Sequence, residues 1–206
     1  KLGLGTSTNQ ALVSTFRSVG ALPVLRDAAA LAGFLRNDAH YPLFGKPHHG
    51  SLSEGSVRLN AIEGDMLSLA DGRSLNVDAI CKDVMAQYSG GFMLQTALDP
   101  HPDMAKIAGM AVGCVRVVTV NDGTGPKAAY ALWKLPAPDA MSDNFWQDGS
   151  LLAMLDLETG HVTRCQRGTG LNVETFEEHP VSGTPVVGAV LPFWAETVEL
   201  ATQAHA

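Results

Sequence analysis

The sequence has few positive charges, few cysteines and no long apolar run. Its 206 residues carry 14 Lys and Arg against 21 Asp and Glu, a formal net charge of −7 at pH 7. This acidic balance excludes a general nucleic-acid surface, which requires a basic field. No apolar segment approaches the roughly 20 residues that span a bilayer, so we expect no membrane span. The three cysteines form no CxxC pair, which favours buried thiols in a reducing, cytoplasmic setting.

The remaining composition is that of a globular chain. Hydrophobic residues make up 46% and charged residues 17%, and the length fits one large domain or two small lobes. The chain opens at Lys1 without an initiator Met, and its last residues read as a helix without a C-cap. We therefore expect a piece of a longer protein.

Hydrophobic periodicity predicts mixed secondary structure. Apolar residues have clear helical spacing after Asp27, which is expected to cap that helix. The same spacing is present in 77–85 and 192–204 and is patchy in 7–19. The prolines of 99–103 indicate a loop. Strands and helices do not alternate regularly, which favours an α+β fold with antiparallel sheets over a doubly wound parallel sheet. The predicted strands are 21–25, 41–47, 56–62, 66–69, 73–77, 92–95, 115–120, 128–135 and 151–157.

The segment 44–57 carries the most chemical information. Its order is strand, lysine, flexible Gly/Ser loop, strand, and it is not a Walker A loop because Lys46 precedes the glycines. Gly50 and Gly55 permit close backbone approach, so the loop N–H groups can surround a polyphosphate while Lys46 adds a point charge. The alternative is a surface hairpin with a solvated lysine. The adjacent His48 and His49 point to opposite faces of a strand, so the pair favours no metal site.

The pattern Lys46-Pro47-x-x-Gly50-Ser51-x-x-x-Gly55-Ser56-Val57 resembles the phosphate-binding strand and loop of ATP-grasp enzymes. It is closer to the sugar-transfer-associated, or α-L-glutamate ligase-like, branch. The similarity covers roughly residues 1–206 in the expected order. It continues through 41–47, 91–95, 100–102, 115–119, 142–144, 156–160 and 179–180.

The resemblance implies an ATP-grasp fold, with two α+β lobes whose antiparallel sheets clamp ATP. Residues 1–95 would form the first lobe and 96–206 an incomplete second lobe. Lys46 would contact the ATP phosphates, and the loop would cover them through Gly50, Ser51, Ser53, Gly55 and Ser56. Gln95 would end the strand before a hinge, where backbone groups of Thr96, Ala97 and Leu98 would bind the adenine edge. The ribose hydroxyls would be taken by Asp103 or Asp99.

Two further residues receive roles from the resemblance. Arg116 lies in the middle of a strand and should face away from Val115 and Val117. By resemblance that side is the cleft, where a guanidinium stabilises phosphoryl or acyl-phosphate charge. Asn144 would bind substrate or phosphate. The alternatives are an exposed sheet arginine and an asparagine that forms a turn.

The function implied is an ATP-dependent carboxylate–amine or carboxylate–thiol ligase acting through an acyl phosphate, with ATP and a small carboxylate as substrates. Mg²⁺ is expected too, but nothing after residue 188 matches the family's magnesium ligands, so we expect them beyond Ala206 and this chain alone to be inactive. The alternatives are a small-molecule phosphotransferase and a non-catalytic nucleotide-binding or scaffold domain linked to polysaccharide biosynthesis. The sequence leaves the acceptor and the oligomeric state open, a homo-oligomer included.

Overall fold

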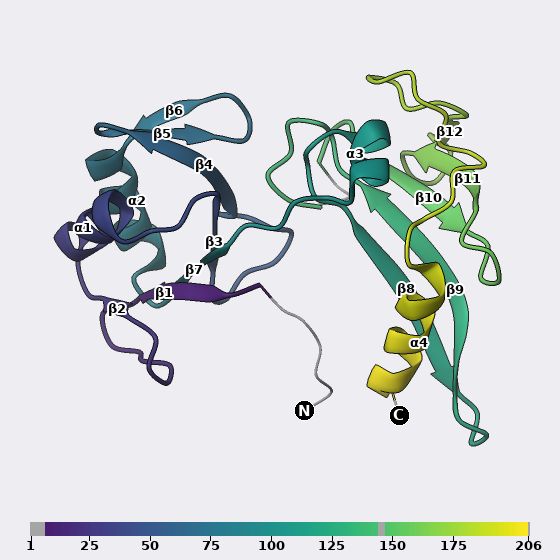
Figure 1. Cartoon of the computed structure of the whole chain (residues 1–206), viewed down its shortest axis with the longest axis horizontal. Coiled ribbons are helices and arrows are strands. Elements are labelled where there is room, and N and C mark those ends of the chain that lie inside the picture. The colour runs from purple at the N-terminus through teal and green to yellow at the C-terminus, as the bar shows by residue number, and fades with distance from the viewer. Residues whose placement is uncertain (1–6, 144–146, 206) are drawn as a thin grey trace. The chain divides into compact units, whose positions relative to one another are not determined.

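The computed structural model of the chain describes residues 7–143 and 147–205. The chain divides into two compact units (Figure 1), here called the N-terminal unit, which ends at Leu98, and the C-terminal unit, which begins at Asp99. This boundary lies a few residues beyond the 95/96 division that the resemblance implied. None of the described helices is long and apolar enough to cross a membrane.

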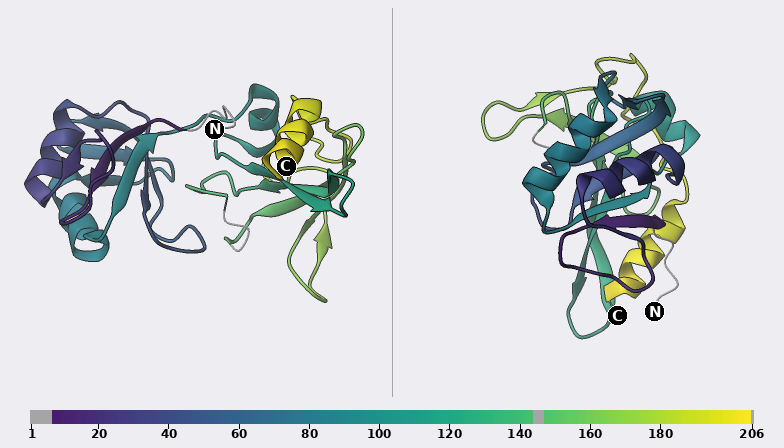
Figure 2. Two further views of the ribbon diagram at one scale, coloured as in Figure 1. Left: turned by 90° about the horizontal axis from the view of Figure 1, so that it is seen from below. Right: turned by 90° about the vertical axis from the view of Figure 1, so that its left-hand side faces the viewer.

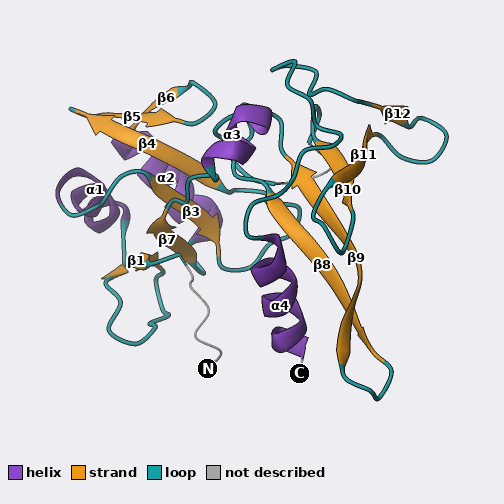
Figure 3. Cartoon of the chain, turned by 45° about the vertical axis from the view of Figure 1, so that its right-hand side comes forward, coloured by secondary structure: helices purple, strands orange, loops and turns teal. Residues whose placement is uncertain are grey.

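The N-terminal unit is built on a seven-stranded sheet in the order β2-β1-β7-β3-β4-β5-β6. The β1–β2 pair is parallel, and every other neighbouring pair is antiparallel. Helices α1 and α2 lie on one face of this sheet (Figures 1 and 3). The elements are β1 (Asn9–Val13), β2 (Val24–Leu25), α1 (Ala28–Asn37), β3 (Leu43–Pro47), β4 (Val57–Glu63), β5 (Met66–Leu69), β6 (Ser74–Asn76), α2 (Val77–Tyr88) and β7 (Phe92–Thr96).

Local signals explain where both helices begin. The predicted cap at Asp27 is confirmed, since its side chain accepts a hydrogen bond from the Ala30 amide at 2.8 Å. Asn76 caps α2 in the same way, through the amides of Asp78 and Ala79. Each such cap contributes about 1 kcal/mol.

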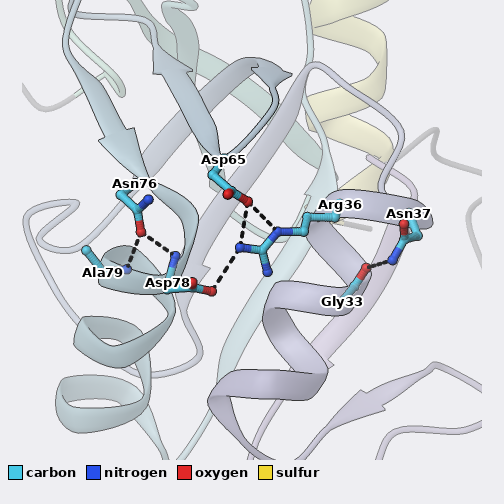
Figure 4. Close-up of polar contacts among 7 residues, drawn as sticks. All are labelled: Gly33, Arg36, Asn37, Asp65, Asn76, Asp78 and Ala79. Atoms are coloured by element: carbon cyan, nitrogen blue, oxygen red, sulfur yellow. Dashed lines mark hydrogen bonds and ion pairs between the residues drawn. The ribbon is translucent and has the colours of Figure 1, made fainter.

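Arg36 ties the two helices to the β4–β5 turn (Figure 4). From α1 it makes ion pairs with Asp65 at 2.8 Å, in the turn, and with Asp78 at 3.0 Å, in the first turn of α2. Since Asp65 and Asp78 are exposed, these pairs add little stability and mainly fix the orientation of the helices. The helices thus cover one face of the sheet, and the opposite face stays open along β3, although β1 buries Leu12 on it.

The C-terminal unit has a five-stranded antiparallel sheet in the order β12-β11-β10-β9-β8. Helices α3 and α4 lie on the same side of it (Figure 2, left). They pack there over a buried core that includes Trp133, Leu151, Ala153 and Trp194. The elements are α3 (Pro102–Ala108), β8 (Cys114–Asn121), β9 (Pro126–Leu135), β10 (Leu151–Leu155), β11 (Val162–Arg167), β12 (Glu174–Thr175) and α4 (Trp194–His205).

The α+β prediction with antiparallel sheets is confirmed, but two local predictions were wrong. Residues 7–19 hold strand β1 and no helix, because β1 gains its stability from pairing with β7 and β2. The proline-rich segment 99–103 is not all loop, because Pro102 starts α3 behind a His101 cap. Proline suits the first position of a helix, where its missing N–H is no loss. Strands β11 and β12 had no counterpart in the sequence prediction.

Candidate functional site

Lys46 lies on the open face of the N-terminal sheet. In β3, Leu43 and Gly45 are buried on the helix side, and the alternation of a strand places Phe44 and the exposed Lys46 on the other side. The Lys46 side chain makes no ion pair or hydrogen bond to the described residues. It therefore offers an unpaired ammonium group beside the loop that follows β3.

The loop between β3 and β4 is made of two consecutive tight turns. In the first, the Glu54 amide donates to the Ser51 carbonyl at 3.1 Å, and Leu52 and Ser53 both have positive φ, 55° and 58°. In the second, the Ser56 amide donates to the Ser53 carbonyl at 3.1 Å, with Gly55 at φ 74°. Two non-glycine residues in the left-handed region are uncommon, and such backbone conformations concentrate at functional sites.

The base of this loop is seated on the side chains of α2 and β7. A Cβ on Gly55 would overlap the Tyr88 hydroxyl and approach the Pro47 ring. A Cβ on Gly45 would overlap the Phe92 ring, which itself packs 5.5 Å from the Tyr88 ring. Gly55 is therefore required here for space as well as for its positive φ.

Arg58 is a second cation on this open face, and we did not predict it. It pairs with Phe44 across the β3–β4 ladder, so it shares the face of Lys46. Its Nη1 donates to the Leu98 carbonyl at 2.6 Å. The alternation of 56–62 held the signal, but only the strand register shows that Arg58 and Lys46 are near neighbours.

The end of β7 has fewer free backbone donors than we expected. The Thr96 amide donates to the Thr8 carbonyl at 2.8 Å and the Ala97 amide donates to the Pro42 carbonyl at 3.0 Å. Gln95 is engaged too, because its Nε2 donates to Asn9 Oδ1 at 2.6 Å. We predicted that backbone groups of Thr96, Ala97 and Leu98 contact adenine. Of their three amides, that of Leu98 alone makes no hydrogen bond to the described residues.

The C-terminal sheet also has an open face, and Arg116 lies on it. Val115 and Val117 pack against the buried core, so the exposed Arg116 points away from it, as predicted. Lys134 pairs with Cys114 across the β8–β9 ladder and shares this face with Arg116.

A half-buried polar cluster lies beside Arg116. Lys134 Nζ is 3.1 Å from Asp143 Oδ2, with 17% and 29% of the side chains exposed. Burial acts to raise the pKa of Asp143, but hydrogen bonds from Cys114 and Lys134 outweigh it and lower that pKa. Burial, reinforced by Asp143, raises the pKa of the Cys114 thiol to about 11. The cluster thus holds a carboxylate, an ammonium and a neutral thiol.

Two other predicted residues are not brought into this arrangement. Asp103 forms an ion pair with Lys106 at 2.7 Å on α3, which packs on the buried face of the sheet and not on the face of Arg116. The hydrogen bond from Lys106 lowers the pKa of Asp103. Asn144 lies outside the described residues.

The predicted loop residues Gly50, Ser51, Ser53, Gly55 and Ser56 do lie in one hairpin with Lys46. The described part of the chain contains no group of three or more His, Cys, Asp or Glu side chains that could hold a metal ion.

Comparison with known proteins gives one finding. The family model described as sugar-transfer associated ATP-grasp matches residues 32–206, a span that includes the β3–β4 hairpin, the end of β7 and Arg116. No curated protein and no solved structure matches the chain.

Proposed function

Because the chain belongs to the sugar-transfer-associated ATP-grasp family, we propose that it binds ATP and serves an ATP-dependent carboxylate–amine or carboxylate–thiol ligation. In such a reaction a carboxylate oxygen attacks the γ-phosphorus of ATP, ADP leaves, and an acyl phosphate forms. The amine or thiol then attacks the carbonyl carbon, phosphate leaves, and the nucleophile loses its proton. The acceptor remains unnamed.

The observation that carries the proposal is the unpaired Lys46 beside a loop with free backbone donors. Within the part of the chain that the structure describes, the amides of Gly50, Ser51 and Ser53 make no hydrogen bonds. Their N–H groups and the Lys46 ammonium are the donors that a triphosphate needs. In this proposal Ser56 and Gly55 close the hairpin over the phosphates.

The adenine contact is proposed at the end of β7. The Leu98 amide would donate to a ring nitrogen, because the Thr96 and Ala97 amides already donate within the unit. Arg58, bound to the Leu98 carbonyl at 2.6 Å, would hold this segment in place. Gln95 would act indirectly, through its hydrogen bond to Asn9.

For the chemical step we propose Arg116 as the group that stabilises charge on the acyl phosphate. An exposed guanidinium on an open sheet face can offer two parallel N–H donors to phosphate oxygens. Lys134 is held by Asp143, so it is less able to contribute its full charge.

The described residues gather no set of carboxylates suited to Mg²⁺, which requires oxygen ligands in near-octahedral geometry. These residues do not fit a resident magnesium site by themselves.

The proposal is tested by titrating ATP into the wild type, Lys46→Met and Lys82→Met. Lys82 is also an exposed lysine, on α2, and serves as the matched control. A hydrogen bond to a charged group contributes about 1.5–3 kcal/mol, so Lys46→Met should weaken ATP binding by about tenfold or more. Equal affinity in all three proteins would remove Lys46 from the phosphate site.

The product separates a ligase from the alternatives. If this domain serves a ligase, a protein that contains it, incubated with ATP, a carboxylate and an amine, should release ADP and form an amide only when all three are present. Transfer of phosphate to an alcohol would identify a phosphotransferase, and ATP binding without ADP release would identify a nucleotide-binding domain.

A further inference from the structure

The ends of three strands of the N-terminal sheet meet at Phe92. Phe92 pairs with Val13 at the end of β1 and with Pro47 at the end of β3. Three segments just beyond these ends therefore lie together: the turn after Val13, His48 and Gly91. His48 and Gly91 follow that turn by about 30 and 75 residues in the sequence.

Gly91 shows how closely they pack. It has φ 153°, and the His48 amide donates to its carbonyl at 2.9 Å. A Cβ on Gly91 would lie 2.9 Å from His48 Cβ and 3.9 Å from Arg17 Cδ. The Arg17 and His48 side chains therefore lie beside the Gly91 Cα, in the space that a side chain at position 91 would need.

The backbone around Arg17 is fixed. Its amide donates to Ser14 Oγ at 3.0 Å, and its carbonyl accepts from Arg26 Nη1 at 2.8 Å. Arg26 Nη1 also donates to the Ser14 carbonyl at 3.0 Å. The turn 14–17 therefore holds the Arg17 side chain over Gly91.

Arg17 differs from the other arginines of this unit in lacking a polar partner. Its Nε is buried and makes no hydrogen bond to the described residues, and its guanidinium carbon lies 5.3 Å from the centroid of the Phe16 ring. Within the same unit, Arg26 and Arg58 donate to carbonyls, and Arg36 and Arg73 donate to carboxylates. A buried donor without an acceptor is costly, and a bound anion would satisfy it.

We infer that Arg17 and Lys46 supply two cations, and His48 a ring nitrogen, to one recess around Gly91 that receives the terminal phosphates of a nucleoside triphosphate. His48 follows the last residue of β3, and its amide continues the pairing with β7 by donating to the Gly91 carbonyl, so Lys46 and His48 lie on the same side of this strand. This inference rests on the proposed function and adds to it a residue that lies far from the loop in sequence. A multiply charged polyphosphate fits the recess better than a single carboxylate, because several donors converge from two separate segments.

The experiment compares ATP, AMP and inorganic tripolyphosphate by calorimetric titration into wild type, Arg17→Met and Arg73→Met. Arg73 is the control, since it is an exposed arginine paired with Asp71. Arg17→Met should weaken ATP and tripolyphosphate binding tenfold or more and leave AMP binding within twofold, while Arg73→Met changes neither. Unchanged ATP affinity in Arg17→Met, or equal weakening of ATP and AMP, would overturn the inference.

The outcomes also separate this inference from the proposed function. Wild-type binding of tripolyphosphate without any preference for ATP, lost in Arg17→Met, would keep the recess and contradict the ATP site. ATP binding that Lys46→Met weakens and Arg17→Met does not would keep the ATP site and contradict the recess. If Arg17→Met fails to fold, His48→Asn replaces it, with a smaller loss of ATP affinity expected and no loss counting against the recess.

Discussion

The seating of the loop on Tyr88 gives the sharpest prediction of stability. Gly55→Ala introduces a Cβ at φ 74° that overlaps the Tyr88 hydroxyl and approaches Pro47. Gly72→Ala introduces the same group at φ 83° in the β5–β6 turn, where no atom lies within 4 Å of the Cβ. Both substitutions carry the cost of an alanine at positive φ. Only Gly55→Ala adds the overlap with Tyr88 and Pro47.

The magnitudes follow from these two contributions. The left-handed conformation costs an alanine about 1–2 kcal/mol, offset in part by the lower entropy of the unfolded chain. Overpacking adds about 1–3 kcal/mol. We therefore expect Gly72→Ala to lower the free energy of unfolding by about 1 kcal/mol and Gly55→Ala by about 2–4 kcal/mol.

Urea denaturation followed by circular dichroism measures both variants. Tryptophan fluorescence serves as a control that reports on the C-terminal unit, since all three tryptophans lie beyond residue 98. Tyr88→Phe in the Gly55→Ala background should recover part of the difference, because it removes the hydroxyl but leaves the ring. The reasoning would be refuted if Gly55→Ala and Gly72→Ala were destabilised equally, since the loop would then not rest on Tyr88.

Two predictions concern titratable groups of the C-terminal unit. Asp143→Asn removes a carboxylate that raises the pKa of Cys114, so that pKa should fall from about 11 and alkylation of Cys114 by iodoacetamide at pH 8.5 should accelerate. Cys114→Ser identifies the reacting thiol, and an unchanged rate would show that Asp143 does not act on it. His179 is almost fully buried, its Nδ1 accepts from the Ser182 amide at 3.3 Å, and burial lowers its pKa. In the unfolded chain His179 takes up a proton near pH 6.5, whereas in the folded chain it stays neutral at that pH. Its contribution to the free energy of unfolding is therefore complete above pH 6.5. As the pH falls below that value, this contribution declines by at most about 1.4 kcal/mol per pH unit. Urea midpoints at pH 7.5 and 5.5 should therefore differ more for the wild type than for His179→Gln, and equal differences would contradict this account.

Sequence reasoning succeeded where the signal was local. The Asp27 cap, the Asp71-Gly72 turn and the strand predicted over 56–62 each depend on a few neighbouring residues, and the structure confirms all three. Strand β1 was missed because Ala11, Leu12 and Val13 are buried in succession. A strand covered on both faces shows no alternation, so its pattern is not distinguishable from a short buried helix.

In the candidate site too, the sequence indicated the residues that lie close together in the chain and missed those brought together by strand pairing. Lys46 and its loop were visible because lysine, glycines and serines lie within a dozen residues. Arg58 needed the β3–β4 register, and Arg17 needed the meeting of three strand ends at Phe92. Sequence spacing contains neither fact, because both arise from long-range strand pairing.

The central claim is that ATP binds to the N-terminal unit through the β3–β4 loop and the end of β7. Amide hydrogen exchange of the chain with and without ATP tests it directly. The account predicts slower exchange in residues 14–17, 48–56 and 96–98, with no change in α1, which lies on the opposite face of the sheet and makes no contact with the loop (Figure 1). Unchanged exchange in the loop at an ATP concentration that saturates binding would contradict it.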